Sequence, residues 1–142
     1  MNTTKPTTAK DIVRKWHLID VKGKVLGRAA VEIAHELMGK GKSYFVRNLD
    51  CGDYVVVVNA AHIDITGNKK TEKTYYRHSG YPSGLKGESL KDLLVRRPDE
   101  AVIRAVKGML PQNKLKATML KRLFVFANET HTYEDKLKEK VK

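Results

Sequence analysis

The order of the elements predicted from this sequence indicates an α/β fold, in which a small, mostly parallel sheet packs against helices. A strand precedes an amphipathic helix, two more strands follow, and further helices lead to a last strand. The segment Tyr54–Val58 contains four consecutive valines without polar alternation. That pattern is typical of a strand covered on both faces, as in parallel sheets. The 142 residues suit one domain, because a chain of this length buries roughly 68–70% of its unfolded surface.

The first two elements are a short strand over residues 16–21 and a helix over residues 26–38. Gly23 marks the turn between them, and Gly39 and Gly41 are expected to end the helix. Within the helix, apolar side chains recur at spacings of three and four residues, which is the pattern of an amphipathic helix. These side chains are Leu26, Ala30, Ile33 and Leu37.

Two further strands and a long connection occupy the middle of the chain. Strands are predicted at Tyr54–Val58 and, more briefly, at residues 63–65, which a Gly67-Asn68 turn follows. Residues 69–88 are rich in Gly, Tyr, Lys and Ser and have no helical stripe. We expect a long loop or an extended arm there rather than a packed element.

Helices predominate in the remainder of the domain until its last strand. Ser89 begins a capping-box pattern ahead of a short helix. Pro98 opens a second helix, which Pro111 ends. A short helix over residues 114–120 and a strand over residues 123–127 complete the predicted domain.

The sequence divides into a core and two terminal segments. Residues 1–11 contain few apolar side chains and are expected to form a flexible tail. Residues 12–130 form the predicted α/β domain with its protruding basic loop. Residues 131–142 are expected to form a charged C-terminal tail, in which a short helix starts near Glu134.

Positive charge is both abundant and clustered. Lys and Arg number 28 against 16 Asp and Glu, which gives a formal net charge of +12. Two stretches contain no acid, one between Glu72 and Glu88 and one between Glu100 and Glu129. Clustered cations attract a dense polyanion, so nucleic acid is the partner that the sequence favours.

The first acid-free stretch has the composition of an RNA-contacting surface. Its cations can bind phosphates, and its Tyr and His rings can stack on unpaired bases. The alternative is a solvated, charged loop whose tyrosines pack on their own domain. We predict RNA contacts at Lys69, Lys70, Lys73, Tyr75, Tyr76, Arg77, His78, Tyr81 and Lys86.

Two other basic groups are candidates for the same surface. The second acid-free stretch has cations without acids at helical spacing, so an external polyanion would relieve their mutual repulsion. Arg104 belongs to this stretch, and its candidate residues are Lys107, Gly108, Lys114, Lys116, Lys121 and Arg122. The third group shares its helix with Glu32 and Glu36 and is the most easily explained as merely solvated. It contains Arg28, Lys40, Lys42 and Arg47.

Catalytic and metal-binding functions have little support. The single cysteine, Cys51, lies between Asp50 and Asp53, whose charges disfavour the thiolate that a nucleophile requires. The five histidines have no metal-ligand spacing, and no cysteine pair accompanies them. We therefore expect no enzyme, metal, cofactor or small-molecule substrate. An enzyme that acts on RNA or nucleotides is kept as the alternative.

Three observations bear on location. No apolar run exceeds five residues, the valine run at Val55–Val58 included, which is far shorter than a membrane span. The first ten residues have no apolar run typical of a signal peptide. A single cysteine cannot form an internal disulfide. We expect a cytoplasmic protein that does not contact membranes.

Six short blocks stand out along residues 16–128. The first three are Trp16-His17-Leu18-Ile19-Asp20, the Gly-Lys-x-Leu-Gly-Arg run at residues 23–28, and Gly52-Asp53-Tyr54. The other three are Thr66-Gly67-Asn68-Lys69, Tyr75-Tyr76-Arg77-His78-Ser79-Gly80 and Val106-Lys107-Gly108-Met109-Leu110-Pro111. Together these blocks resemble the ribosomal protein L13 family of the large subunit, in its bacterial form.

The resemblance implies a three-layer α/β/α domain with a four-stranded sheet. It also implies a protein that binds large-subunit ribosomal RNA, adjoins other large-subunit proteins and enters the particle early in assembly. The family's RNA contacts carry over to Tyr75, Tyr76, Arg77, His78, Lys107 and Gly108. The chain departs from the family at Lys116, where a glycine is usual. A free regulator that binds messenger RNA would use the same cationic surface, so that alternative stays open.

Overall fold

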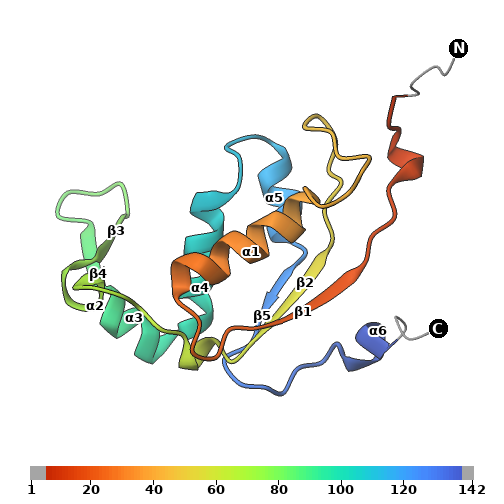
Figure 1. Ribbon diagram of the computed structural model, residues 1–142. Coiled ribbons are helices and arrows are strands. Elements are labelled where there is room, and N and C mark those ends of the chain that lie inside the picture. The colour runs from red at the N-terminus through yellow and green to blue at the C-terminus, as the bar shows by residue number, and fades with distance from the viewer. Residues whose placement is uncertain (1–5, 139–142) are drawn as a thin grey trace, which may run out of the picture.

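Three parallel strands form the sheet at the centre of the domain. The computed structural model describes residues 6–138, and Figure 1 shows their arrangement. In register, Leu18 lies opposite Val56, and Val56 lies opposite Phe124, so these three side chains share one face of the sheet. The strands, in their order across the sheet, are β1 (Trp16–Asp20), β2 (Tyr54–Val58) and β5 (Leu123–Val125).

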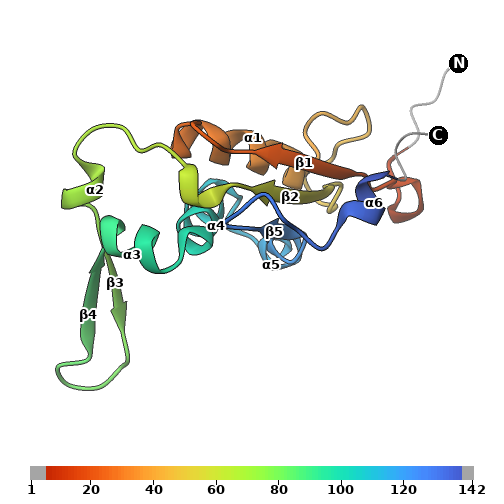
Figure 2. The same ribbon diagram turned by 90° about the horizontal axis from the view of Figure 1, so that it is seen from below.

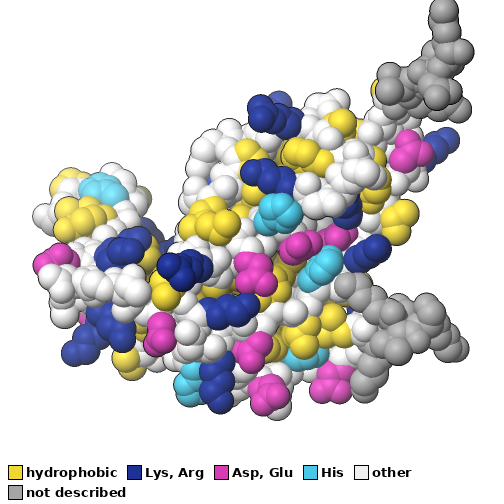
Figure 3. Space-filling view, viewed as in Figure 1, with side chains coloured by type: hydrophobic (Ala, Val, Ile, Leu, Met, Phe, Trp, Pro, Cys, Tyr) yellow, Lys and Arg dark blue, Asp and Glu magenta, His cyan; other side chains and the backbone are white. Residues whose placement is uncertain are grey.

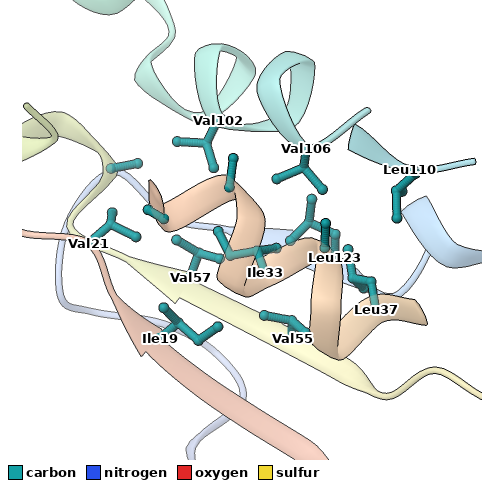
Figure 4. Close-up of a cluster of buried hydrophobic side chains, with 14 of the residues drawn as sticks. Ile19, Val21, Ile33, Leu37, Val55, Val57, Val102, Val106, Leu110 and Leu123 are labelled. Carbon is teal, nitrogen blue, oxygen red and sulfur yellow. The ribbon is translucent and has the colours of Figure 1, made fainter. Parts of the chain in front are cut away.

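The longer helices lie on one face of this sheet. Each new strand is added on the same side as the one before, so right-handed crossovers place the connecting helices on the same face. Figure 4 shows α1 between α4 and the strands. The other face is covered, within the described residues, by the C-terminal segment (Figure 2). The helices are α1 (Leu26–Met38), α4 (Pro98–Met109), α5 (Leu115–Leu120) and, in the C-terminal segment, α6 (Glu134–Lys138).

The sheet has three strands where the family resemblance implies four. Residues 63–65, predicted as a strand, follow the short 3-10 helix η2 (Ala60–His62) and contribute one isolated bridge, from Asp64 to Val25. The Asp64 carbonyl accepts the amide of Leu26, at a distance of 2.8 Å. The chain thus pairs with the turn before α1 and then leaves the sheet. The mixed α/β class and the parallel sheet are confirmed, whereas no fourth strand joins this sheet among residues 6–138.

The core is built mainly from β2 and the helices facing it. Ile33, Val55 and Val57 are fully buried, and Figure 4 shows them packed together. Val56 points to the opposite face and is equally buried. Aromatic rings from three parts of the chain stack on that face, including Trp16 and Tyr54, whose ring centroids are 4.4 Å apart. The prediction that this strand is covered on both faces is therefore confirmed.

Residues 69–89 form an arm that projects from the domain (Figure 2). Its strands pair antiparallel as a separate two-stranded sheet, so the segment is an extended hairpin rather than a loop. At the tip, Gly80 and Ser83 have φ values of 86° and 60°, which allow the chain to reverse. The elements are α2 (Lys69–Glu72), β3 (Thr74–His78) and β4 (Leu85–Ser89).

A short helix, α3 (Leu90–Arg96), anchors the arm to the domain. The Ser89 hydroxyl accepts the Asp92 amide at 3.2 Å, which confirms the predicted cap. Leu90, Leu93 and Ala101 are buried together beneath the base of the arm. This small cluster is separate from the main core, so few apolar contacts hold the arm in place.

The two ends of the described chain lie against the domain. The short 3-10 helix η1 (Ala9–Asp11) precedes β1, and the Thr7 hydroxyl donates to the Tyr44 carbonyl at 3.1 Å. The tail predicted over residues 1–11 lies partly outside the described residues. None of the described helices is long and apolar enough to cross a membrane.

Candidate nucleic-acid surface

The arm exposes most of its basic and aromatic side chains. All of its lysines and Arg77 are exposed, and the Tyr76 and Tyr81 side chains are 70% and 76% exposed. Tyr75 instead points back toward the domain, where the Arg104 guanidinium lies 4.8 Å from its ring centroid. The two explanations offered by the sequence therefore both apply. Tyr75 packs on its own domain, whereas Tyr76 and Tyr81 are available to a partner.

Between the arm and helices α3 and α4 lies a hollow of about 650 Å³, here called the arm hollow. Five basic side chains but only two carboxylates line it. One of the basic residues, Arg104, comes from the second acid-free stretch, so the fold brings two of the predicted basic groups together. The lining residues are Tyr75, Arg77, Lys86, Gly87, Glu88, Arg96, Arg97, Glu100 and Arg104.

The two carboxylates of the arm hollow are already paired. Glu88 lies 2.8 Å from Arg96, and Glu100 pairs with Arg104 and, at 3.8 Å, with Arg97. The hydrogen bond from Arg104 is the main cause that lowers the pKa of Glu100 below its usual value. Glu100 therefore stays charged at neutral pH and orders the guanidinium groups around it.

Arg77 and Lys86 are the two cations of this hollow without an acidic partner among the described residues. They lie directly opposite each other in the register of β3 and β4. Like charges in directly opposed positions destabilise a hairpin. The arm thus keeps an unfavourable pair of positive charges at the mouth of a basic hollow, which an external anion would stabilise.

A second hollow, of about 370 Å³, lies between the start of α1, the arm base and the end of α4. Lys69, Lys73 and Arg104 line it together with Gly27 and Gly108. A Cβ atom added at either glycine would meet nothing within 4 Å, so the backbone there is open to a ligand. We call this the helix hollow. Arg104 lines both hollows, and they therefore adjoin.

The other predicted cations lie outside these two hollows. Lys40 lines a smaller depression with His35 and Met109, and Arg28 lines another with Lys24 and Glu32. Figure 3 shows blue side chains gathered around the base of the arm and the adjoining helices. The Lys116 ammonium donates a hydrogen bond to the Gln112 side chain at 2.8 Å. The remaining predicted cations are more dispersed, and they are Lys70, Lys107, Lys114, Lys116 and Lys121.

Two predicted surface cations prove to be internal. Arg122 is only 7% exposed, and its guanidinium binds both carboxylate oxygens of Asp50. Lys42 donates to the Cys51 carbonyl at 2.8 Å and to the Asp53 carboxylate. The expectation that cations of the second acid-free stretch lack acidic partners is therefore wrong for Arg104 and Arg122. Glu100 lies four residues before Arg104, at the edge of the acid-free stretch, so local spacing could have shown that pair. The partner of Arg122 could not be found in this way, because Asp50 is 72 residues from Arg122.

A compact ion-pair network surrounds Asp53. Burial alone would raise the pKa of this carboxyl, but hydrogen bonds from Lys42, the Lys15 amide and His17 outweigh burial and lower it. The His17 Nε2 lies 2.9 Å from Asp53 and 3.5 Å from Glu36. These three residues are close enough to share a cation, but the Lys42 ammonium already neutralises Asp53. We interpret the network as structural.

Comparison with known proteins identifies the family. The family model described as ribosomal protein L13 matches residues 14–132. The chain belongs to the ribosomal protein L13 family. A relative from Dehalococcoides mccartyi, named large ribosomal subunit protein uL13, is 53% identical over 125 residues, which is 88% of this chain and 87% of the relative. A relative of the same name from Geobacter sulfurreducens is 47% identical over 134 residues, 94% of each chain.

The resemblance recognised in the sequence is thus confirmed, and membership of a family of ribosomal proteins agrees with the expectation that the chain is not an enzyme. Four of the recognised blocks line the two hollows, and residues 23–28 and Thr66–Lys69 are two of them. Tyr75–Gly80 supplies β3 and the arm tip, and Val106–Pro111 supplies the end of α4. Arg96 and Arg97 were missed. Their available signal was two adjacent arginines before a helix-opening proline, Pro98.

Proposed function

We propose that this chain is a structural protein of the large ribosomal subunit, located in the cytoplasm, that binds large-subunit ribosomal RNA and is added early in assembly. Neighbouring large-subunit proteins are its other partners. The observation that carries the proposal is the pair Arg77 and Lys86. These cations oppose each other without an acidic partner and face a hollow that three further arginines line.

The two hollows suit an RNA backbone that passes across α4. Arginine presents a planar fork of donors that matches a phosphate, so Arg77 and Arg96 can position one phosphate in the arm hollow. Lys69 and Lys73 can neutralise the next along the helix hollow, where Gly27 and Gly108 let the backbone approach closely. Arg104, which lines both hollows, would contact the RNA between these positions.

The arm tip supports stacking on unpaired bases. The Tyr76 and Tyr81 rings are largely exposed, and a base that stacks on an aromatic ring typically contributes about 1–3 kcal/mol. The His78 ring is oriented by the Gly80 amide, which donates to its Nδ1 at 2.9 Å. These rings project beyond the domain, so the arm can reach between RNA segments while the domain remains outside them.

Cations beyond the hollows would add non-specific contacts at the periphery. Phosphate contacts fix placement, and specificity then comes from the folded shape of the RNA. Lys42 and Arg122 are left out because both serve internal ion pairs. The proposed peripheral contacts are Arg28, Lys40, Lys70, Lys107, Lys114, Lys116 and Lys121.

The salt dependence of binding tests the proposal. The affinity of purified protein for large-subunit ribosomal RNA fragments should fall with salt, with a log–log slope of about −0.7 to −0.9 per phosphate contacted. Replacing Arg77 and Lys86 by alanine should make the slope shallower by about 1 for each residue. The control, Lys10→Ala with Lys22→Ala, removes the same charge from exposed sites outside both hollows. Equal slopes for the two double variants would refute the proposed surface.

Fractionation of a lysate separates this role from that of a free regulator. A subunit protein co-migrates with large subunits on a sucrose gradient and is depleted from the light fractions. A substantial free pool that carries messenger RNA would favour the regulator instead.

A further inference from the structure

A third hollow, of about 450 Å³, lies on the sheet face away from α1, and its character is opposite to that of the basic hollows. It contains three carboxylates and three apolar side chains, and none of its lining residues is Lys or Arg. We call it the acidic hollow. Its lining residues are Leu18, Asp20, Val58, Asn59, Glu129, His131, Glu134 and Leu137.

The strands and the C-terminal segment build this hollow together. Leu18 and Asp20 are two residues apart in β1, so both side chains point to the face away from α1. Asp20 lies opposite Val58 in the register of β1 and β2. The C-terminal segment is held over this face by Tyr133, whose ring lies 5.3 Å from Trp16 and 4.4 Å from Phe124. The hollow is therefore a shaped feature between two anchored parts of the chain.

The charge of the acidic hollow favours a cationic partner over RNA. Asp20 accepts the Asn59 amide at 2.9 Å and the Lys22 backbone amide at 2.9 Å. The bond from Asn59 is the main cause that lowers the pKa of Asp20, so this carboxylate is charged at neutral pH. Glu129 is exposed nearby. The negative charges of Asp20 and Glu129 disfavour a phosphate backbone here, although the chain as a whole carries a net charge of +12.

We propose that the acidic hollow binds a Lys- and Arg-rich segment of another protein, which places an apolar side chain on Leu18. Charge complementarity identifies the basic partner, because the carboxylates at the rim match its cations. Leu18 supplies the apolar contact, since 51% of its surface is exposed within the hollow. The inference rests on the proposed function and deepens it, because it assigns a neighbouring protein to a particular surface, separate from the RNA-binding hollows.

Site-specific photo-cross-linking in assembled large subunits tests this inference. A benzophenone amino acid at position 18 should cross-link to a protein, and mass spectrometry should place the cross-link within a Lys- and Arg-rich segment. The same probe at position 76, on the arm tip, should cross-link to ribosomal RNA. Cross-links from position 18 to RNA, to this chain's own residues, or to nothing would overturn the inference.

A charge reversal provides the second measurement. Glu129→Lys should reduce the cross-link from position 18 at least about fivefold, because like charges across an interface are strongly unfavourable. Asp135→Lys is the matched control, since Asp135 is also an exposed acid of the C-terminal segment but does not line the hollow. Equal cross-linking in both variants would show that charge does not select the partner. Failure of the position-76 probe would count against RNA binding by the arm and leave this inference untouched.

Discussion

The sheet domain and the arm are held in place by very different amounts of buried surface. Ile33, Val55 and Val57 are fully buried between the sheet and α1, so the domain is stabilised from within. The arm has exposed side chains on most of its length and is anchored by a cluster of three buried residues beneath its base. A two-stranded hairpin is at best marginally stable alone. The residue types of the domain are therefore explained by packing in its core. Those of the arm are explained by the proposed contacts with RNA.

The buried ion pair offers the largest test of that contrast. Arg122→Ala should destabilise the domain by about 3–5 kcal/mol, because it removes the bidentate partner of Asp50 in a largely buried site and leaves this carboxylate only the more distant Arg14, at 3.7 Å. Urea denaturation followed by circular dichroism measures the change. Adding Asp50→Ala should recover part of the loss. If the double variant is less stable than Arg122→Ala alone, the pair is not coupled as the geometry indicates.

A cavity in the core should have the next largest effect. Ile33→Ala removes buried methyl groups between α1 and β2 and should cost about 2–5 kcal/mol. Leu85→Ala in the arm is the matched change, since Leu85 is 61% exposed, and should cost less than about 0.5 kcal/mol. Comparable losses of unfolding free energy would contradict the division into a packed domain and a solvent-exposed arm.

The helix cap at the base of the arm should have an intermediate effect. Ser89→Ala removes the acceptor of the Asp92 amide and should cost about 1 kcal/mol. Because the cap joins β4 to α3, amide hydrogen exchange should accelerate in residues 74–96 more than in α1. Uniform acceleration over the whole chain would show that the arm and the domain unfold together.

The smallest effect on stability should come from the basic surface of the arm. Changing Lys69, Lys70 and Arg77 together to alanine should weaken RNA binding by about tenfold or more, since three phosphate contacts are lost. The free energy of unfolding should change by less than about 0.5 kcal/mol for each exposed site. Thermal melting and RNA titration of the same samples measure both quantities. Unfolding of the variant would show that these side chains are structural.

Local patterns in the sequence predicted most of the helices and strands. The apolar spacing of α1, the valine run of β2, the Ser89 cap and the opening proline of α4 all depend on neighbouring residues, and the structure confirms each. Residues 63–65 show where such patterns fail. Their alternation resembles a strand, but the chain makes a single bridge there before it turns toward the arm.

The candidate surface was only partly predictable. Composition identified the basic and aromatic arm, and the structure separates its exposed rings from Tyr75, which packs on Arg104. Charge gaps could not show that Arg122 lies inside the domain, since its acidic partner comes from a distant part of the chain. Nor could they show that Arg96 faces the arm, because the arm and α3 meet only when the hairpin folds back.

The sequence by itself determined the family, the excess of positive charge and the helices and strands, because each of these depends on residue types and short spacings. Only the tertiary structure decided which cations are free to bind an anion and which are used inside. An ion pair such as Arg122–Asp50 forms between segments that the fold brings together, and the same fold gathers the carboxylates of the acidic hollow onto the opposite face of the sheet.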